Sequence, residues 1–353
     1  MIRIKARVTT ARGAVLATLW GAVAVAYKFG CSQQDGLGAR IVTSAVFFAV
    51  GTGLIVYVRR ALLRELRQAR RVAGAAQSVV LRPVPARLDG LNLAAAQLSA
   101  DRGATIGGDL YEAVATEHGV RVVMGDVRGH GLGALGTVAA VLGSFREAAH
   151  DEPELVSVLR RLERTLARHL RERSRAEHPS SGAQDPDNPV AEEFVTLLLL
   201  EIDGEGGLRA LNCGHPWPYL LRDTRVEPLT RAEPLPPLGP FPLPAELEAR
   251  PCGRLLPGES LVLFTDGAED ARDARGRFLS LPTVLREAVY DHPLSAQTVL
   301  RTVFGAVLHH TGGRPTDDIA VLVLRNDRRN AGIPGARGTA RQAPTDPQPT
   351  THR

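Results

Sequence analysis

Aspartates at the ends of apolar runs are the residues of this sequence best suited to chemistry. Asp109 opens the run "DLYEAVAT", and Asp126 closes the run "VVMGD". Asp266 closes "SLVLFTD", while Asp317 and Asp318 open "DDIAVLVLR". If those strand ends meet, several carboxylates converge, and each raises the pKa of its neighbours. Divalent cations remove that repulsion, and oxygen ligands without Cys or His favour Mg²⁺ or Mn²⁺ over zinc.

Each of these aspartates, taken alone, has a simpler explanation as a turn residue, because Asp-Gly after a strand is an ordinary turn signal. The metal hypothesis therefore depends on agreement among all of the strand ends. Two histidines are also conceivable acids or ligands. His130 and His215 have Gly or Pro neighbours, and loop packing is the preferred interpretation of both.

The geometry of one hairpin decides whether two of the carboxylates meet. The segment "DLYEAVATEHGVRVVMGD" predicts two strands that turn near His118-Gly119. A two-residue turn there pairs Asp126 with Tyr111, so that Asp109 lies diagonally opposite Asp126 on the same face, roughly 7–8 Å away. A slip of one residue would instead send Asp109 to the other face of the sheet.

The elements that carry these residues predict an α+β domain. Strands come first, two helices follow over about 131–149 and 154–173, and strands resume at "FVTLLLLEID", "LRALNC" and "WPYLLR". Further strands precede and follow one or two helices within 282–308. This order departs from regular βαβ alternation, so it favours antiparallel sheets with helices packed outside them.

The N-terminal segment predicts a membrane anchor. Residues 13–27 and 41–58 are uncharged and mostly apolar, and the second run is long enough to span hydrocarbon. We therefore expect a two-helix transmembrane hairpin over residues 1–58, with a signal peptide or buried core helices as the alternatives. Arginines flank both ends of this segment, so we expect a multi-pass membrane protein with both termini, and the domain that carries the aspartates, in the cytoplasm.

A helical linker is expected over residues 59–81, and a disordered tail rich in Pro, Thr, Arg and Gly over 326–353. Apolar residues of the linker recur at spacings of three and four: Leu62, Leu66, Ala69, Ala73, Ala76 and Val80. This short heptad seam is compatible with a solvated linker helix or with a homodimer formed through the linker.

Composition excludes several classes of function. The formal net charge is +5, yet no basic run is interleaved with aromatic residues, so we expect no nucleic-acid partner. The three cysteines, Cys31, Cys213 and Cys252, are far apart and have no histidine at zinc spacing. Neither a zinc site nor a disulfide framework is therefore expected.

Several motifs together resemble a known family. "IGGDLYEAV", "MGDVRGHGLGA", "EFVTLLLLEID", "LNCGHPWPYLLR", "LVLFTDGAEDAR" and "PTDDIAVLVLR" occur in the order found in SpoIIE-like phosphatases, the bacterial branch of the PPM family of metal-dependent protein phosphatases. The resemblance covers roughly residues 74–325. It implies a PPM-type β-sandwich of two antiparallel sheets flanked by helices, with the phosphatase domain at residues 82–325.

The resemblance also implies a centre that holds two Mn²⁺ or Mg²⁺ ions. In it, Asp126 would bridge both metals, the backbone carbonyl of Val127 would complete one site, and Asp266 and Asp317 would hold one metal. Asp109 would support the other. Asp126 and Asp266 are thus the residues on which catalysis is expected to depend.

The same resemblance suggests roles for three further residues near the metal centre. Glu112 stands where the family usually has Asp. Glu112 and Asp318 are expected to contact the metal ligands without binding the metal themselves. Arg128 is a candidate contact for the substrate phosphate, although a solvated loop arginine is the simpler interpretation.

The activity implied is hydrolysis of phosphoserine or phosphothreonine by a metal-activated water, with no phosphoenzyme intermediate. The substrate implied is a phosphorylated regulatory protein, a STAS-type anti-sigma factor antagonist that acts in a partner-switching pathway. Two alternatives remain open. One is a catalytically weak or silent binding module of the same fold, and the other is a hydrolase of small phosphate esters.

Overall fold

The computed structural model describes residues 21, 37–98, 107–129, 131–177, 193–290 and 295–328. The chain divides into two compact units. The first comprises Met1–Val80 with Asp101–Ile106, and the second comprises Leu81–Ala100 with Gly107–Arg353. The second unit carries every predicted site residue.

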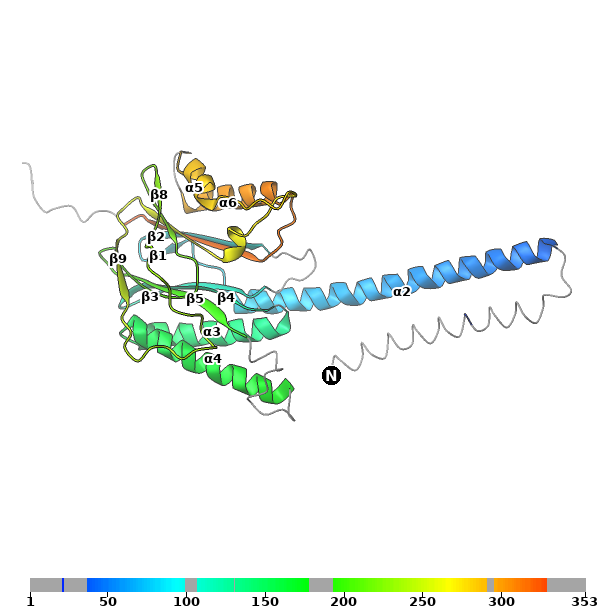
Figure 1. The fold of residues 1–353 in the computed structure, drawn as a ribbon, viewed down its shortest axis with the longest axis horizontal. Coiled ribbons are helices and arrows are strands. Elements are labelled where there is room, and N and C mark those ends of the chain that lie inside the picture. Colours follow the sequence, from blue (N-terminus) through cyan, green and yellow to red (C-terminus); the bar gives the residue numbers. More distant parts are fainter. Residues whose placement is uncertain are drawn as a thin grey trace, which may run out of the picture. The chain divides into compact units, whose positions relative to one another are not determined.

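The first unit contributes one long helix, α2 (Leu37–Val80), which runs through the second predicted span and the predicted linker without a break (Figure 1). Its sequence contains no proline, and the helix ends shortly before Pro83, as expected because proline lacks a backbone N–H and disfavours a helical residue before it. Large apolar side chains along α2 are exposed, among them Phe48 and Ile55.

The structure does not support the predicted transmembrane hairpin. Within the described part of the chain, no helix combines the length and the apolar character needed to cross a membrane. The first predicted span, at 13–27, lies outside the described residues apart from Gly21, and the second lies within α2. Most side chains of the predicted heptad seam also lie outside the described residues.

Two antiparallel sheets form the centre of the second unit, as predicted. One has the strand order β1-β2-β11-β10-β7-β8, and the other has the order β3-β4-β5-β6-β9. The strands of the first sheet are β1 (Arg87–Leu88), β2 (Leu91–Leu98), β7 (Tyr219–Arg222), β8 (Arg225–Pro228), β10 (Ser260–Phe264) and β11 (Ile319–Asn326). Those of the second are β3 (Asp109–Thr116), β4 (Gly119–Val127), β5 (Val195–Ile202), β6 (Gly207–Cys213) and β9 (Arg250–Arg254).

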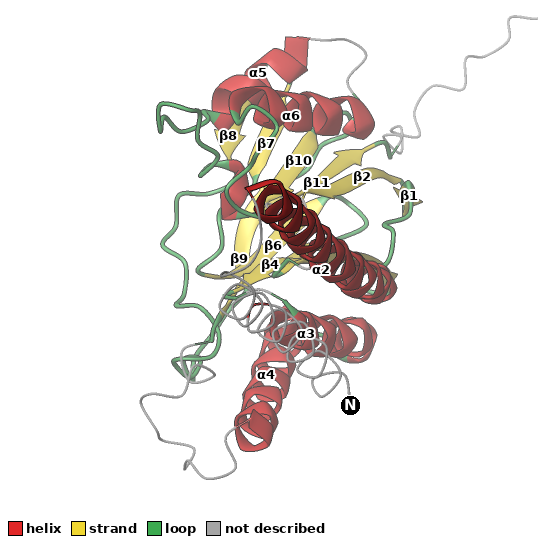
Figure 2. Cartoon of the chain, turned by 90° about the vertical axis from the view of Figure 1, so that its right-hand side faces the viewer, coloured by secondary structure: helices red, strands yellow, loops and turns green. Residues whose placement is uncertain are grey.

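Four helices cover the outer faces of the two sheets (Figures 1 and 2). α3 (Leu132–Asp151) and α4 (Leu155–Glu177) pack on β3 to β6, and α5 (Leu281–Tyr290) and α6 (Ala296–His310) pack on the other sheet. α4 shows why such a helix forms, because its buried residues recur every three or four positions: Leu155, Val158, Leu159, Leu162 and Leu166.

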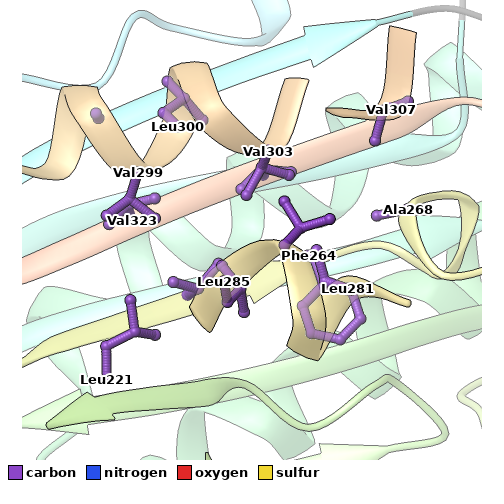
Figure 3. Close-up of a cluster of buried hydrophobic side chains, with 14 of the residues drawn as sticks. Leu221, Phe264, Ala268, Leu281, Leu285, Val299, Leu300, Val303, Val307 and Val323 are labelled. Carbon is purple, nitrogen blue, oxygen red and sulfur yellow. The ribbon is translucent and has the colours of Figure 1, made fainter. Parts of the chain in front are cut away.

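The central strands are buried on both faces. Along β10, Leu261 and Leu263 face the core between the sheets, whereas Val262 and Phe264 pack against α5 and α6 (Figure 3). A strand covered on both faces has a continuous apolar sequence instead of an alternating one. The runs in β5, β10 and β11 are of this kind, and they deliver polar residues only at their ends.

Three short strands were not predicted from the sequence. β1, β8 and β9 have two to five residues and mostly exposed side chains, so they lack the apolar pattern that marks a strand.

Side-chain contacts continue past residue 325, the predicted end of the phosphatase domain. The Asn326 side chain donates to the Leu255 carbonyl at 2.7 Å, and the Arg328 guanidinium donates to the Asp89 carboxylate at 2.6 Å. Residues 326–328 therefore belong to the folded domain.

Candidate metal centre

The β3–β4 hairpin places Asp109 directly opposite Asp126, so the predicted diagonal register was wrong by two residues. The turn residues are Glu117 and His118, and Thr116 pairs with Gly119. Gly119 has a φ of 114°, and a Cβ there would lie 2.3 Å from the Ile202 carbonyl oxygen. The turn therefore forms one position earlier than predicted. Because the shift is even, both aspartates remain on one face of the sheet, and they lie closer together than expected.

Asp109 is buried, with 1% of its surface exposed, and Thr265 holds it in place. The Thr265 hydroxyl donates to Oδ2 of Asp109 at 3.2 Å and accepts from the backbone N–H of Ala320 at 2.8 Å. This one side chain therefore links β3 to β11 from the end of β10. Sequence reasoning missed Thr265. The available signal was a polar residue at the position where the inward alternation of Leu261 and Leu263 continues.

The other predicted ligands come from the opposite sheet. Asp266 begins a single 3-10 turn, η2 (Asp266–Ala268), directly after β10. Asp317 and Asp318 immediately precede β11, and the Asp318 backbone N–H donates to Oδ1 of Asp317 at 2.8 Å. The Asp318 carboxylate lies close to the chain just before Asp109, because a Cβ on Gly107 would be 2.5 Å from its Oδ2, and its charge raises the pKa of Asp109. Asp318 is thus nearer the candidate centre than its predicted supporting role suggested.

Three glycines let the backbone approach these carboxylates closely. A Cβ on Gly108 would lie 2.7 Å from Oδ1 of Asp126 and 2.2 Å from the Val127 carbonyl oxygen. A Cβ on Gly107 would lie 2.5 Å from Oδ2 of Asp318, and one on Gly267 would lie 2.0 Å from the Asp318 carbonyl oxygen. The "GGD" and "TDG" motifs therefore need glycine for space beside the acidic groups.

Electrostatics show that the aspartates are close enough to disturb one another. Burial raises the pKa of Asp126 to about 7, and the charges of Asp266, Asp317 and Asp318 add to the rise. Burial, followed by the Asp126 and Asp318 charges, raises the pKa of Asp109 well above its usual value. The pKa of Asp266 is also raised, first by burial and then by Asp317. A bound cation would relieve this repulsion.

The donor chemistry fits a hard divalent cation, although the side chains are not gathered into a closed ligand set. Among the described residues, no three Asp, Glu, His or Cys side chains are positioned together to hold one metal ion. The facing groups are carboxylate and carbonyl oxygens from both sheets, the donors that Mg²⁺ and Mn²⁺ prefer.

Glu112 does not support the predicted ligands. Its carboxylate binds Nε of Arg146 on α3 through both oxygens, at 2.8 and 2.9 Å. Side chains alternate along a strand, so Glu112 lies on the opposite face of β3 from Asp109. The predicted role beside the metal was wrong, and Glu112 instead joins the sheet to α3.

Arg128 lies immediately after the Val127 carbonyl, and its side chain is exposed. Its guanidinium carbon is 5.3 Å from the centre of the Phe194 ring, and its backbone N–H donates to the Phe194 carbonyl at 2.9 Å. This position is compatible with a contact to a substrate phosphate, which stays a prediction.

His215 packs behind the candidate centre. It is buried, and its Nδ1 lies 3.1 Å from the hydroxyl of Thr196, the residue opposite Asp126 on β5. Burial lowers the pKa of His215 to about 3, so the ring is neutral and unsuited to acid catalysis near pH 7. This arrangement agrees with the expected packing role. His130 lies outside the described residues.

The fold has counterparts among solved structures. The RsbU and RsbW domains of Rv1364c from Mycobacterium tuberculosis match with a TM-score of 0.53 and 21% identity, covering 70% of this chain and 62% of that one. The SiaA-PP2C domain of Pseudomonas aeruginosa matches with a TM-score of 0.51 and 15% identity, covering 76% of this chain and 98% of that one. The phosphatase domain and regulatory fragment of SpoIIE from Bacillus subtilis match with a TM-score of 0.50 and 15% identity, covering 67% of this chain and 62% of that one. Among curated protein sequences, none matches this chain.

The family described as Stage II sporulation protein E (SpoIIE) matches residues 116–327, which is more than half of the chain. The matched segment includes Asp126, Asp266 and Asp317, while Asp109 lies just before it. The chain spans about three fifths of the length of the Rv1364c structure. This protein therefore belongs to the SpoIIE family and has the fold of the PPM-type serine/threonine phosphatases.

Proposed function

We propose that this protein hydrolyses phosphoserine or phosphothreonine in a protein substrate, with two divalent metal ions at the strand ends. Family membership and fold indicate a phosphoprotein phosphatase. The observation that carries the proposal is the direct pairing of Asp109 with Asp126, beside Asp266 and Asp317 of the other sheet. Neighbouring carboxylates that raise one another's pKa repel when they are ionised, and a bound cation offsets this repulsion.

In the proposed centre, Asp126 would contact both ions, Asp266 and Asp317 would hold one of them, and Asp109 would support the other. The Val127 carbonyl would complete one site. When bound, Mn²⁺ or Mg²⁺ supplies an activated water and neutralises charge on the phosphoryl group.

Other residues of the chain orient these groups. Thr265 fixes the Asp109 carboxylate, and the glycines beside Asp126 and Asp318 keep the backbone close. Arg128 is proposed to bind the substrate phosphate.

The test is an assay of the full chain with Mn²⁺ on a phosphoserine peptide. Asp126→Asn and Asp266→Asn should each lower kcat/KM by at least about 100-fold, because each removes a charged oxygen ligand. Asp223→Asn is the matched control, since this carboxylate lies in the turn between β7 and β8 at a φ of 51°, which asparagine tolerates.

Three results would contradict the phosphatase proposal. Inactive wild-type protein would favour a silent binding module. Full activity in both ligand variants would show that hydrolysis does not depend on the proposed metal centre. A preference for p-nitrophenyl phosphate over every phosphoprotein tested would favour a hydrolase of small esters.

We further propose that the substrate is a phosphorylated STAS-type anti-sigma factor antagonist. The support is the resemblance of the motif set to SpoIIE-like phosphatases, together with family membership. A phosphoproteomic comparison of a deletion strain with its parent should show a phosphorylated STAS protein accumulating without the enzyme. An unchanged phosphorylation level in every STAS protein would refute this substrate.

Membrane attachment through residues 1–58 and a homodimer through the linker are proposals from sequence alone. Their support is the uncharged run at 41–58, the flanking arginines and the apolar spacing of the linker. Full-length protein should remain in the membrane pellet after carbonate extraction, and light scattering in detergent should give a dimer mass. Release by carbonate would refute the attachment, and a monomer mass would refute the dimer.

A further inference from the structure

A small, rigid hairpin follows the proposed metal ligand Asp266 along the chain. The N–H groups of Glu269 and Asp270 donate to the Asp266 carbonyl at 2.9 and 2.8 Å, which turns the chain back tightly. Residues 271–279 then form the hairpin, closed by a hydrogen bond of 2.9 Å from the Leu279 N–H to the carbonyl of Ala271, which is buried. The hairpin thus starts within a few residues of the proposed centre.

The same hairpin is tied to the segment that leads to Asp317. Nε2 of His310, at the end of α6, lies 2.8 Å from the Arg277 carbonyl oxygen. Residues 311–316 then connect α6 to Asp317, and Arg314 lies on this connection with its side chain exposed. The hairpin is therefore bordered on both sides by chain that carries proposed metal ligands.

Internal contacts hold the hairpin in one shape. Asp273 accepts backbone N–H groups from Arg275 and Arg277 at 2.8 and 2.9 Å, and its other oxygen binds the Arg277 guanidinium at 2.7 Å. Across the hairpin, the Arg272 guanidinium carbon lies 4.3 Å from the centre of the Phe278 ring, and this ring is 55% exposed. A rigid surface loses little entropy when it binds a partner.

The exposed charge of this surface is mostly positive. Arg277 neutralises Asp273, while the Arg272 guanidinium lies over the Phe278 ring. Within the described part of the chain, the side chains of Arg275 and Arg314 make no ion pair or hydrogen bond. Several cations and an exposed aromatic ring thus lie beside the proposed centre, where an anionic substrate must approach.

We propose that residues 271–279 together with Arg314 dock acidic residues that flank the phosphorylated side chain of the protein substrate. This inference rests on the proposed phosphatase function and adds a substrate preference to it. Exposed ion pairs are individually weak, so two or three of them should give a preference of about tenfold in KM rather than absolute specificity. The preference should decline as salt screens the charges.

The experiment compares two phosphoserine peptides on the full chain with Mn²⁺. One peptide carries Asp and Glu on both sides of the phosphoserine, and the other carries Asn and Gln instead. Wild type should show a KM about tenfold lower for the acidic peptide, with similar kcat for both. Arg275→Glu/Arg314→Glu should reduce this KM ratio to about one. Arg225→Glu/Arg254→Glu, with the same charge change far from the proposed centre, should keep the wild-type ratio.

A second measurement separates this inference from the proposed function. Fluorescence anisotropy records binding of the unphosphorylated acidic peptide, which requires no turnover. Loss of that binding in Arg275→Glu/Arg314→Glu alone supports docking even if no phosphatase activity is found. Equal KM for both peptides in wild type overturns the docking proposal. Equal weakening of peptide binding by both double variants also overturns it. Hydrolysis of both peptides would, in either case, leave the phosphatase function intact.

Discussion

At the scale of single residues, the hydrogen bond from Thr265 orients Asp109, one of the proposed metal ligands. Asp109 is buried beside other carboxylates, and the Thr265 hydroxyl supplies a hydrogen bond that partly offsets the rise in its pKa. The same hydroxyl satisfies the backbone N–H of Ala320. A single side chain therefore sets both the orientation of a proposed ligand and the spacing of two strands.

Thr265→Val should lower the affinity for Mn²⁺ by about tenfold, because the ligand loses its orienting donor. It should also lower the free energy of unfolding by about 1–3 kcal/mol, since the buried N–H of Ala320 loses its acceptor. Isothermal titration calorimetry and urea denaturation measure the two effects. Thr265→Ser retains the hydroxyl and should restore most of both, and failure of that rescue would count against the orienting role.

At the scale of elements, buried polar pairs join α3 and α4 to the sheet beneath them. Arg121 of β4 is fully buried and binds the buried Glu201 of β5 at 2.8 Å. Its guanidinium also donates to the carbonyl oxygens of Ala149 and Pro153, at 2.9 and 2.7 Å, where α3 ends and the chain turns into α4. Arg121 therefore fixes the helix pair at the end away from the aspartates.

Arg121→Leu should lower the free energy of unfolding by about 3–5 kcal/mol, because Glu201 loses the buried one of its two arginine partners and several carbonyl groups lose their donor. Urea denaturation followed by circular dichroism measures the loss. Arg254→Leu is the control, since its partner Glu205 is exposed and such pairs contribute less than about 1 kcal/mol. Similar losses in both variants would show that burial does not determine the effect.

At the scale of the whole molecule, the candidate centre opposes the folding of the metal-free protein at neutral pH. Asp109, Asp126 and Asp266 have raised pKa values in the folded state. A group of this kind stabilises the fold below its unfolded pKa, near 4, and this contribution disappears as the pH rises through its folded pKa. For Asp126 the folded pKa is about 7, so its contribution is lost between about pH 4 and pH 7.

The Tm of protein treated with a chelator should therefore fall as the pH rises from about 5 to 8. Asp126 alone accounts for up to about 3 kcal/mol of this change, because its folded pKa of about 7 lies two units above the lower end of this range. Added Mn²⁺ should raise the Tm most at the upper end of this range, where the carboxylates are ionised and able to bind it. Differential scanning calorimetry measures both trends. A Tm that is independent of pH without metal, or an Asp126→Asn variant with the wild-type slope, would contradict this account.

The sequence by itself determined the fold class and the identity of the acidic strand ends. Both follow from the order of neighbouring residues, because an apolar run indicates a buried strand and an aspartate at its end is easily recognised. The glycines beside Asp109 and Asp266 were also visible in the sequence. A Cβ on Gly108 would meet the Asp126 carboxylate, and one on Gly267 would meet the Asp318 carbonyl oxygen.

Only the tertiary structure decided which of these residues meet. The backbone hydrogen bonds that pair two strands do not depend on side-chain identity, so the register follows from the turn. The turn residues precede Gly119, and the observed register differs by two residues from the predicted one. The packing of the layers also decided two contacts. Glu112 meets Arg146 of α3, and Thr265 meets Asp109, which lies 156 positions away in sequence. Such contacts depend on how two sheets pack face to face, and no local pattern of residues encodes that packing.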